Sequence, residues 1–195
     1  MSSRLRKLPL LGLILLAAVA LGACGDSHTK VTTGTYAGES GQNAPYLDVG
    51  PLVYEVQLSR ELNPYDVEDS AYLEGLSAEQ RKLAPGQEWF AVFVQVYNNH
   101  SQAHPAATNM KISDTQGNSY LPIVPASHNS FAYTGGTVPG KERLPALNTI
   151  SSEGPTQGTM LLFKIQTVSL DNRPLTLKIV DPDDAAETAS AELDV

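Results

Sequence analysis

The sequence predicts an all-β fold, an antiparallel β-sandwich with a short helical insertion after its first strand. About seven short segments of alternating apolar and polar residues recur along the chain, as in strands that bury one face. The 15 glycines and 13 prolines are spread between these segments and suit the turns of such a fold. No long helical pattern interrupts them, and no alternation of strands with helices supports a parallel sheet.

The first predicted strand is 53–59, because apolar and polar residues alternate there, which indicates one buried and one wet face. The apolar members are Tyr54, Val56 and Leu58, and the polar members are Glu55 and Gln57. The following residues, 61–85, are expected to form short helical turns, since Asp66 can cap a helix that ends at Gly75.

The strongest predicted strand is 88–97, which is apolar on both faces. One face carries Phe90, Val92, Val94 and Val96, and the other carries Trp89, Ala91 and Phe93. Such a strand is usually central in its sheet and covered on both sides. We therefore expect the insertion 61–85 to cover its second face.

The remaining strands are predicted from the same alternation. They are 110–114 and 119–124, joined by a turn at Gly117, then 158–166, 175–180, a final strand 189–195, and a short strand around 144–150. Gly117 suits a turn that needs positive φ, and Pro122 restricts its strand to an edge.

The N-terminus has the order of an export signal, with Arg4, Arg6 and Lys7 before an apolar run, 8–21. The run is too short for an ordinary spanning helix, which needs ~20 apolar residues. Leu-Gly-Ala-Cys at 21–24 resembles the lipobox of bacterial lipoproteins, in which the signal is cut before the cysteine and the cysteine receives a diacylglyceryl group and often an N-acyl chain. A simple secretory signal is the alternative.

These features divide the chain into a signal peptide, 1–23, a lipidated Cys24 with a flexible polar tether, 24–47, and the sandwich domain, 48–195. The tether would lift the domain a few tens of Å from the membrane, at ~5–6 Å × √n for n residues. The expected location is the outward face of a bacterial cell membrane, with lipid as the anchor.

The charge of the chain excludes nucleic acid as an expected partner. Loss of residues 1–23 would remove three of the 13 basic residues and none of the 21 acidic ones. An acidic protein repels phosphate backbones and anionic lipid headgroups. The membrane is therefore contacted through the lipid anchor, and an envelope or extracellular protein is the expected partner.

Three segments, 89–98, 112–122 and 161–165, resemble a family of bacterial lipoproteins of unknown function. The family has an immunoglobulin-like β-sandwich distantly similar to the mycobacterial secreted immunoprotective antigen. The resemblance implies this fold over about residues 50–180 and gives no catalytic residues. The insertion 61–85 departs from the family pattern and leaves the strand order open.

Metal and catalytic chemistry find little support in the sequence. His100 and His104 have an i, i+4 spacing, but Pro105 disfavours a helix there, so we predict no metal site and keep the pair as weak candidates. Met110 and His128 could add copper ligands. No Gly-x-Ser-x-Gly or isolated carboxylate pair indicates an enzyme, and no cofactor is expected.

The insertion is the predicted partner-binding region, through Tyr65, Tyr72 and Leu73 beside five acidic side chains from Glu61 to Glu74. The alternative is that these side chains face inward and cover Trp89 and Phe93. The predicted function is a non-catalytic binding domain on an envelope lipoprotein. A copper-type metal-handling lipoprotein and an envelope hydrolase are the alternatives.

Cys24→Ser should leave an unprocessed precursor and abolish acyl labelling, because the thiol is the acceptor of the lipid. The measurement is incorporation of labelled fatty acid together with the size of the product. Labelling that persists in the variant would contradict lipidation at Cys24.

Overall fold

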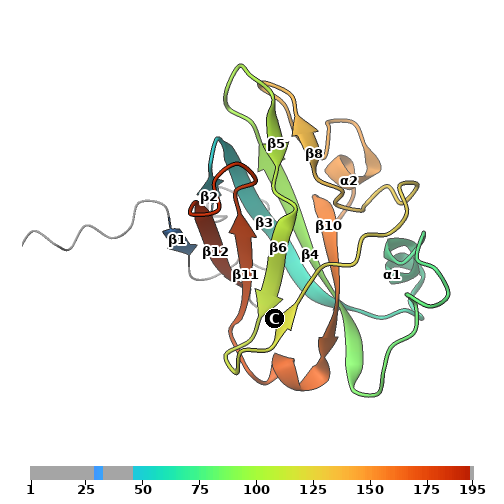
Figure 1. Cartoon of the computed structure of the whole chain (residues 1–195). Coiled ribbons are helices and arrows are strands. Elements are labelled where there is room, and N and C mark those ends of the chain that lie inside the picture. Colours follow the sequence, from blue (N-terminus) through green and yellow to red (C-terminus); the bar gives the residue numbers. More distant parts are fainter. Residues whose placement is uncertain (1–28, 33–45, 194–195) are drawn as a thin grey trace, which may run out of the picture.

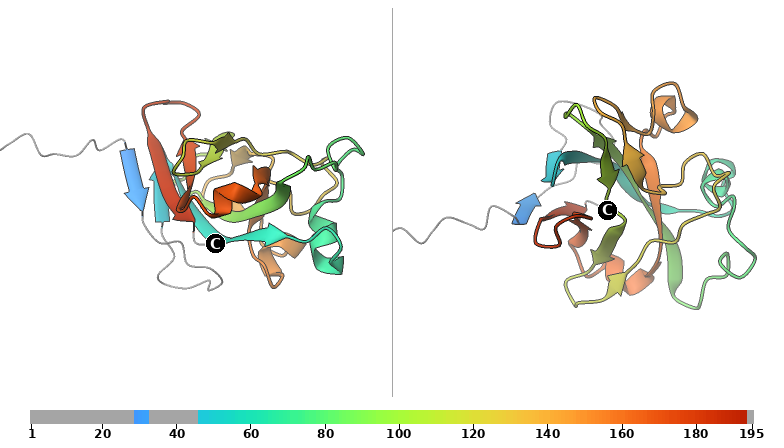
Figure 2. Two further views of the ribbon diagram at one scale, coloured as in Figure 1. Left: turned by 90° about the horizontal axis from the view of Figure 1, so that it is seen from below. Right: turned by 45° about the horizontal axis from the view of Figure 1, so that its top comes forward.

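The computed structural model describes residues 29–32 and 46–193, which form two sheets packed face to face (Figures 1 and 2). The first sheet contains, in spatial order, β1 (Thr29–Thr32), β12 (Thr188–Leu193), β11 (Leu175–Val180), β6 (Asn109–Ser113) and β7 (Ser119–Tyr120). The second contains β10 (Thr159–Gln166), β4 (Gln87–Tyr97), β3 (Leu52–Leu62) and β2 (Tyr46–Val49), with β9 (Arg143–Leu144) also paired to β4.

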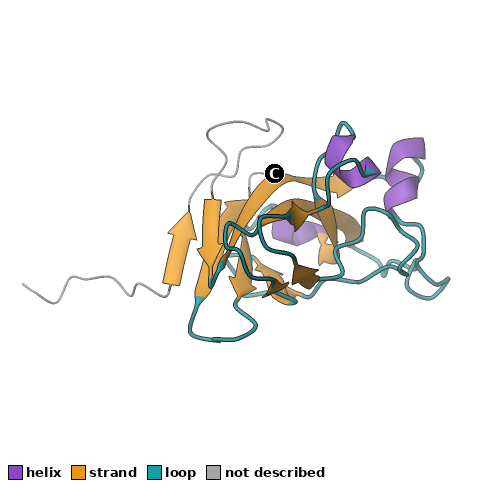
Figure 3. Ribbon diagram, turned by 90° about the horizontal axis from the view of Figure 1, so that it is seen from above, coloured by secondary structure: helices purple, strands orange, loops and turns teal. Residues whose placement is uncertain are grey.

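A small third sheet and three short helices complete the described elements (Figure 3). They are β5 (His104–Ala106) with β8 (Gly136–Val138), then α1 (Val67–Tyr72), α2 (Ile150–Glu153) and the 3₁₀ helix η1 (Thr167–Leu170). Among the described strands, β1 pairs with β12 in parallel and the other strand pairs are antiparallel. The predicted β-sandwich is confirmed, and the helical insertion follows β3, the strand predicted at 53–59.

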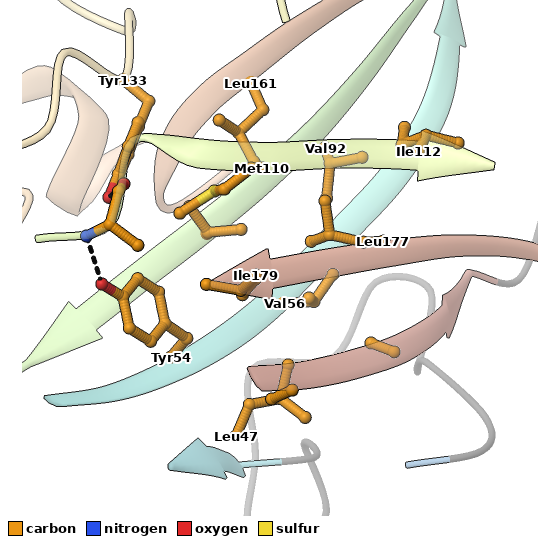
Figure 4. Close-up of a cluster of buried hydrophobic side chains, with 14 of the residues drawn as sticks. Leu47, Tyr54, Val56, Val92, Met110, Ile112, Tyr133, Leu161, Leu177 and Ile179 are labelled. Atoms are coloured by element: carbon orange, nitrogen blue, oxygen red, sulfur yellow. Dashed lines mark hydrogen bonds between the residues drawn. The ribbon is translucent and has the colours of Figure 1, made fainter. Parts of the chain in front are cut away.

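The core between the sheets is built from the alternating apolar residues predicted for each strand (Figure 4). It includes Phe90, Val92, Val94 and Val96 of β4, Leu161, Phe163 and Ile165 of β10, and Leu175, Leu177 and Ile179 of β11. Two buried tyrosines anchor the loop after β5: the Tyr54 hydroxyl accepts from Ala107 N at 2.7 Å, and the Tyr133 hydroxyl donates to Ala107 O at 2.6 Å.

A second apolar cluster covers the other face of β4, as predicted. The insertion, predicted at 61–85, corresponds to residues 63–86 between β3 and β4. Its apolar side chains pack on the outward apolar face of β4. Figure 1 shows α1 on the side of β4 away from β11 and β12. The cluster contains Leu62, Tyr72, Leu73, Leu76, Trp89, Ala91, Phe93, Met160 and Leu162. The Tyr72 ring meets the Phe93 ring edge-on at 5.1 Å between centroids, a favoured aromatic geometry.

The insertion is tied to β3 by an ion pair and a helix cap. The Asp66 side chain accepts from the backbone N–H of Glu68 and Asp69, as its predicted capping role requires. Arg60 of β3 forms a two-point hydrogen-bonded ion pair with Asp69, and Asp69 also accepts from Asn63 N at 2.7 Å. Burial opposes ionisation of Asp69, but these bonds outweigh it and lower the pKa of the carboxyl.

A β-bulge at Gln57 changes which face β3 presents. Val56 pairs with Val94, but Leu58 pairs with Phe93, so one residue of β3 is left over. Tyr54 therefore packs in the inter-sheet core, whereas Leu58 lies against the second cluster. The prediction that Tyr54, Val56 and Leu58 share one buried face was therefore wrong for Leu58.

The solvent-exposed face predicted for the same strand was also wrong, because Glu55 and Gln57 are buried.

A second difference lies in the predicted tether, 24–47, which contributes β1 and the first residues of β2. Leu47 is fully buried, so the predicted domain boundary at 48 moves toward the N-terminus. Cys24 and the signal peptide lie outside the described residues.

The smaller predictions have mixed outcomes. The strand predicted around 144–150 was wrong, because this segment contains only the last residue of β9 and the first residue of α2. The hairpin turn holds Gly117 at φ +89°. The Asp114 carboxylate accepts from Asn118 N at 2.9 Å and from Ser169 Oγ at 2.7 Å, which joins the hairpin to η1. The final strand ends at Leu193, and Val195 lies outside the described residues.

Val94→Asp should destabilise the fold by at least ~3 kcal/mol, because it buries a charge without a partner in the inter-sheet core. The matched control is Val67→Asp in the first turn of α1, where Val67 is 88% exposed and should change stability by less than ~0.5 kcal/mol. Urea denaturation of both variants gives the comparison, and equal stabilities would refute the central position of β4.

Candidate functional site

The face of the second sheet that points away from the first sheet has two halves of different character. Near the insertion it is apolar and covered by the second cluster. Near β2 and β9 it is polar, and two rows of paired residues cross it. One row is Tyr46, Glu55 and Gln95, and the other is Asp48, Val53, Tyr97 and Arg143. We call these residues, with Asn99 after β4, the polar face.

Strand alternation places these side chains together. Leu47 and Val49 of β2 point into the core, so Tyr46 and Asp48 point outward. In β4 the core residues are Val94 and Val96, so the intervening Gln95 faces outward.

Buried polar groups under this face are hydrogen-bonded to one another. Glu55 and Gln95 are only 4% and 2% exposed. The Tyr97 hydroxyl lies 2.8 Å from Glu55 Oε2 and 2.6 Å from Gln95 Oε1, two acceptors that compete for its one proton. Arg143 Nη1 donates to Gln95 Oε1 at 3.3 Å, and Gln95 Nε2 donates to Gln157 Oε1 at 3.4 Å. These bonds hold the Tyr97 ring and the amides of Gln95 and Gln157 in place.

Two electrostatic features follow from this burial. Burial raises the pKa of the Tyr97 hydroxyl, and the hydrogen bond and negative charge of Glu55 raise it further, so the hydroxyl stays protonated at neutral pH. Arg143 Nε is buried without a hydrogen-bond partner among the described residues. Unpaired buried donors are uncommon in folded proteins.

A surface hollow of about 460 Å³ lies over this network. It is lined by Tyr46, Asp48, Val53, Tyr97 and Asn99. Tyr46 is 55% exposed, so its ring is open to solvent at the edge of the hollow. The backbone oxygen of Asn99 accepts from Lys141 Nζ at 2.6 Å, so the loop before β9 is joined to the rim. The hollow thus offers a fixed aromatic and polar surface to solvent.

The predicted anchors in the insertion are separated by the structure. Tyr65 is 95% exposed, but Tyr72 and Leu73 are each 3% exposed and belong to the second cluster. The expectation that all three form a binding surface is corrected for Tyr72 and Leu73, because the apolar face of β4 takes both side chains. The insertion leaves open a groove of about 260 Å³ beside Tyr65 and Trp89.

The weak metal candidates are brought together only in part. The His100 and His104 rings lie edge-on with centroids 5.6 Å apart. Met110 is 1% exposed within the inter-sheet core and cannot reach them. In the described part of the chain, no group of three or more His, Cys, Asp or Glu side chains is placed to hold a metal ion.

Sequence reasoning missed the polar face, although one signal was present. Gln95 interrupts the outward apolar series of β4 after Phe93, and Glu55 is its register partner on β3. Tyr46 and Arg143 belong to the polar face through strand pairing, and Asn99 belongs to it through the position of its loop. The sequence pattern did not reveal these placements.

Comparison with known proteins gives structural likeness at low sequence identity. No family model matches the chain, and no curated protein matches it. The yjhA protein from Bacillus subtilis is similar with a TM-score of 0.53 and 12% identity, covering 83% of this chain and 100% of that one. A functionally unknown protein from Listeria monocytogenes has a TM-score of 0.51 and 10% identity, covering 78% and 82%. A lipoprotein candidate from Bacillus subtilis, ycdA, has a TM-score of 0.46 and 10% identity, covering 79% of this chain and 39% of that one.

The likenesses with TM-scores above 0.5, to the yjhA protein and to the Listeria monocytogenes protein, support the fold alone. The described residues therefore form a β-sandwich of a kind found in other bacterial proteins. The predicted link to the mycobacterial antigen stays a prediction. Within the described ranges, no helix has the length and apolar character needed to cross a membrane.

Tyr97→Phe should lower the free energy of unfolding by ~1–2 kcal/mol, because the buried Glu55 and Gln95 lose their shared donor. The raised pKa of Tyr97 implies that wild-type stability falls as the pH rises above ~10, where unfolded tyrosine ionises. The variant should lose less stability over that range. Urea denaturation at pH 7 and above pH ~10 measures both effects, with exposed Tyr46→Phe as the control. Equal stability of the two variants would refute the role given to Tyr97.

Proposed function

We propose that this protein is an envelope lipoprotein whose β-sandwich is a non-catalytic binding module, with the hollow of the polar face as its binding surface. The observation that carries the proposal is an open hollow with an exposed aromatic ring, built on a buried hydrogen-bonded network. Sites of ~300–1,000 Å³ with a few fixed polar groups are typical of small-ligand recognition.

The network favours binding over catalysis. The Glu55 carboxylate faces the Tyr97 hydroxyl, and Gln95 is shared between Tyr97 and Arg143, so these groups hold one another. Side chains fixed in this way lose little freedom when a ligand arrives, which increases affinity. A hydrolase would need a nucleophile or base aimed at the ligand, and the paired groups here serve to orient the surface.

The metal-handling alternative has less support. It would use His100 and His104, whose rings are close, but Met110 is enclosed in the core. The remaining side chains near the two histidines would have to supply further ligands, and Pro105 lies between His104 and the rest of β5.

A lipid on Cys24 would place the domain close to the membrane. Thr29, the first residue of β1, is five residues after Cys24, a distance of at most ~18 Å at ~3.6 Å per residue. Because β1 pairs with β12, the edge of the first sheet would lie next to the bilayer. This revises the expectation of a tether of a few tens of Å.

The proposal is tested by photo-crosslinking in intact cells. A photoreactive aliphatic amino acid with a diazirine group at position 53, in place of the valine that lines the hollow, should give a defined adduct with an envelope component. The same residue at position 65, an exposed site on the insertion, should not. Mass spectrometry of the full chain identifies adducts of any chemical class. Adducts at position 65 alone, or at neither position, would refute the hollow as the binding surface.

A further inference from the structure

The hollow of the polar face has a composition that specifies the chemistry of its ligand. Its apolar part consists of two tyrosine rings and one aliphatic side chain, from Tyr46, Tyr97 and Val53. Tyr46 is 55% exposed and lies on β2 at the end of its sheet, so its ring is open to a ligand. Flat aromatic surfaces of this kind suit a ligand with a flat, weakly polar C–H face.

The polar part of the hollow supplies both donors and acceptors. The Asn99 amide offers two donor hydrogens and an acceptor oxygen. The Asp48 carboxylate already has a partner, but its two oxygens have about four lone pairs and can accept further hydrogen bonds. A ligand that matches this surface must itself both donate and accept at neighbouring atoms. Hydroxyl groups do so, since each has one donor hydrogen and two acceptor lone pairs.

Little charge is presented to a ligand in the hollow, although the whole chain has a formal net charge of −8. Of the five lining residues only Asp48 carries a formal charge, and its side chain already takes part in an interaction. Glu55 and Arg143 belong to the network beneath, and Lys141 is bonded to the backbone of Asn99. A single engaged carboxylate gives no cluster of like charge that would select an ion, so the hollow favours an uncharged ligand.

We propose that this hollow binds a neutral saccharide, with one face of a pyranose ring stacked on Tyr46 and its hydroxyl groups hydrogen-bonded to Asn99 and Asp48. A sugar ring combines a C–H face with adjacent hydroxyls and carries no charge, which matches the three features above. The proposal names the ligand of the binding surface proposed for this protein and rests on that function.

The test uses the full chain in micelles of a detergent without a sugar headgroup, because a glycosidic detergent would compete for the site. The probes are four neutral oligosaccharides, maltotetraose, mannotetraose, galactotetraose and tetraacetylchitotetraose. Isothermal titration calorimetry and saturation-transfer NMR measure binding. At least one probe should bind with a dissociation constant below about 1 mM.

Three variants locate the binding. Tyr46→Ala should weaken it by about tenfold or more, through loss of the stacking surface. Asn99→Leu, which keeps the size of the side chain, should also weaken it by about tenfold. Tyr65→Ala removes another exposed tyrosine outside the hollow and should change nothing. Melting temperatures of all three should equal that of the wild type, because each side chain is exposed.

Two charged probes, trilysine and trigalacturonate, test the charge argument. Both should bind at least about tenfold more weakly than the best neutral probe. Tighter binding of either one through Tyr46 would overturn the saccharide proposal and leave the binding function intact. No Tyr46-dependent binding of any neutral probe would also overturn it, whereas the crosslink at position 53 independently decides whether the hollow binds a ligand at all.

Discussion

Strand β4 needs an apolar cover on both faces, and the arrangement of the other elements follows from that requirement. Phe90, Val92 and Val94 on one face are covered by the opposing sheet, while Trp89 and Phe93 on the other are covered by the insertion. A two-layer sandwich alone would leave the second face in water, at ~25 cal/mol for each Å² of apolar surface left exposed. The helical insertion is therefore part of the core, although it lies outside the sandwich itself.

The bulge at Gln57 lets one long strand serve two different surfaces. Before the bulge, β3 turns Tyr54 and Val56 toward the opposing sheet. After it, Leu58 and Leu62 lie against the insertion, and Arg60 reaches the ion pair with Asp69. A regular strand would have kept all of these even-numbered side chains on one face. The bulge thus marks the boundary between the covered apolar half of the outer face and the open polar half.

The polar half shows how a sheet can bury polar groups and still leave a hollow open to solvent. Glu55 and Gln95 lose most of their contact with water, but Tyr97 and Arg143 provide the hydrogen bonds that offset this cost. The same bonds hold the Tyr97 ring at the base of the hollow while Tyr46 stays exposed above the edge strand. The stability of the fold and the shape of the hollow therefore depend on one network, so its members cannot be exchanged independently.

The sequence by itself determined six main strands, β3, β4, β6, β10, β11 and β12. It also determined the central position of β4 and the role of the insertion as its cover, because alternation and two-sided hydrophobicity are local patterns with one favourable burial. It also predicts export and lipidation, from local motifs near the N-terminus. Only the tertiary structure decided that β3 changes face at Gln57, that Tyr72 is buried while Tyr65 is exposed, and that Glu55 is covered. It likewise brought Tyr46, Tyr97, Asn99 and Arg143 together from three strands and a loop. These outcomes depend on register and long-range pairing, where a shift of one residue reverses the direction of every side chain, and no local pattern records that shift.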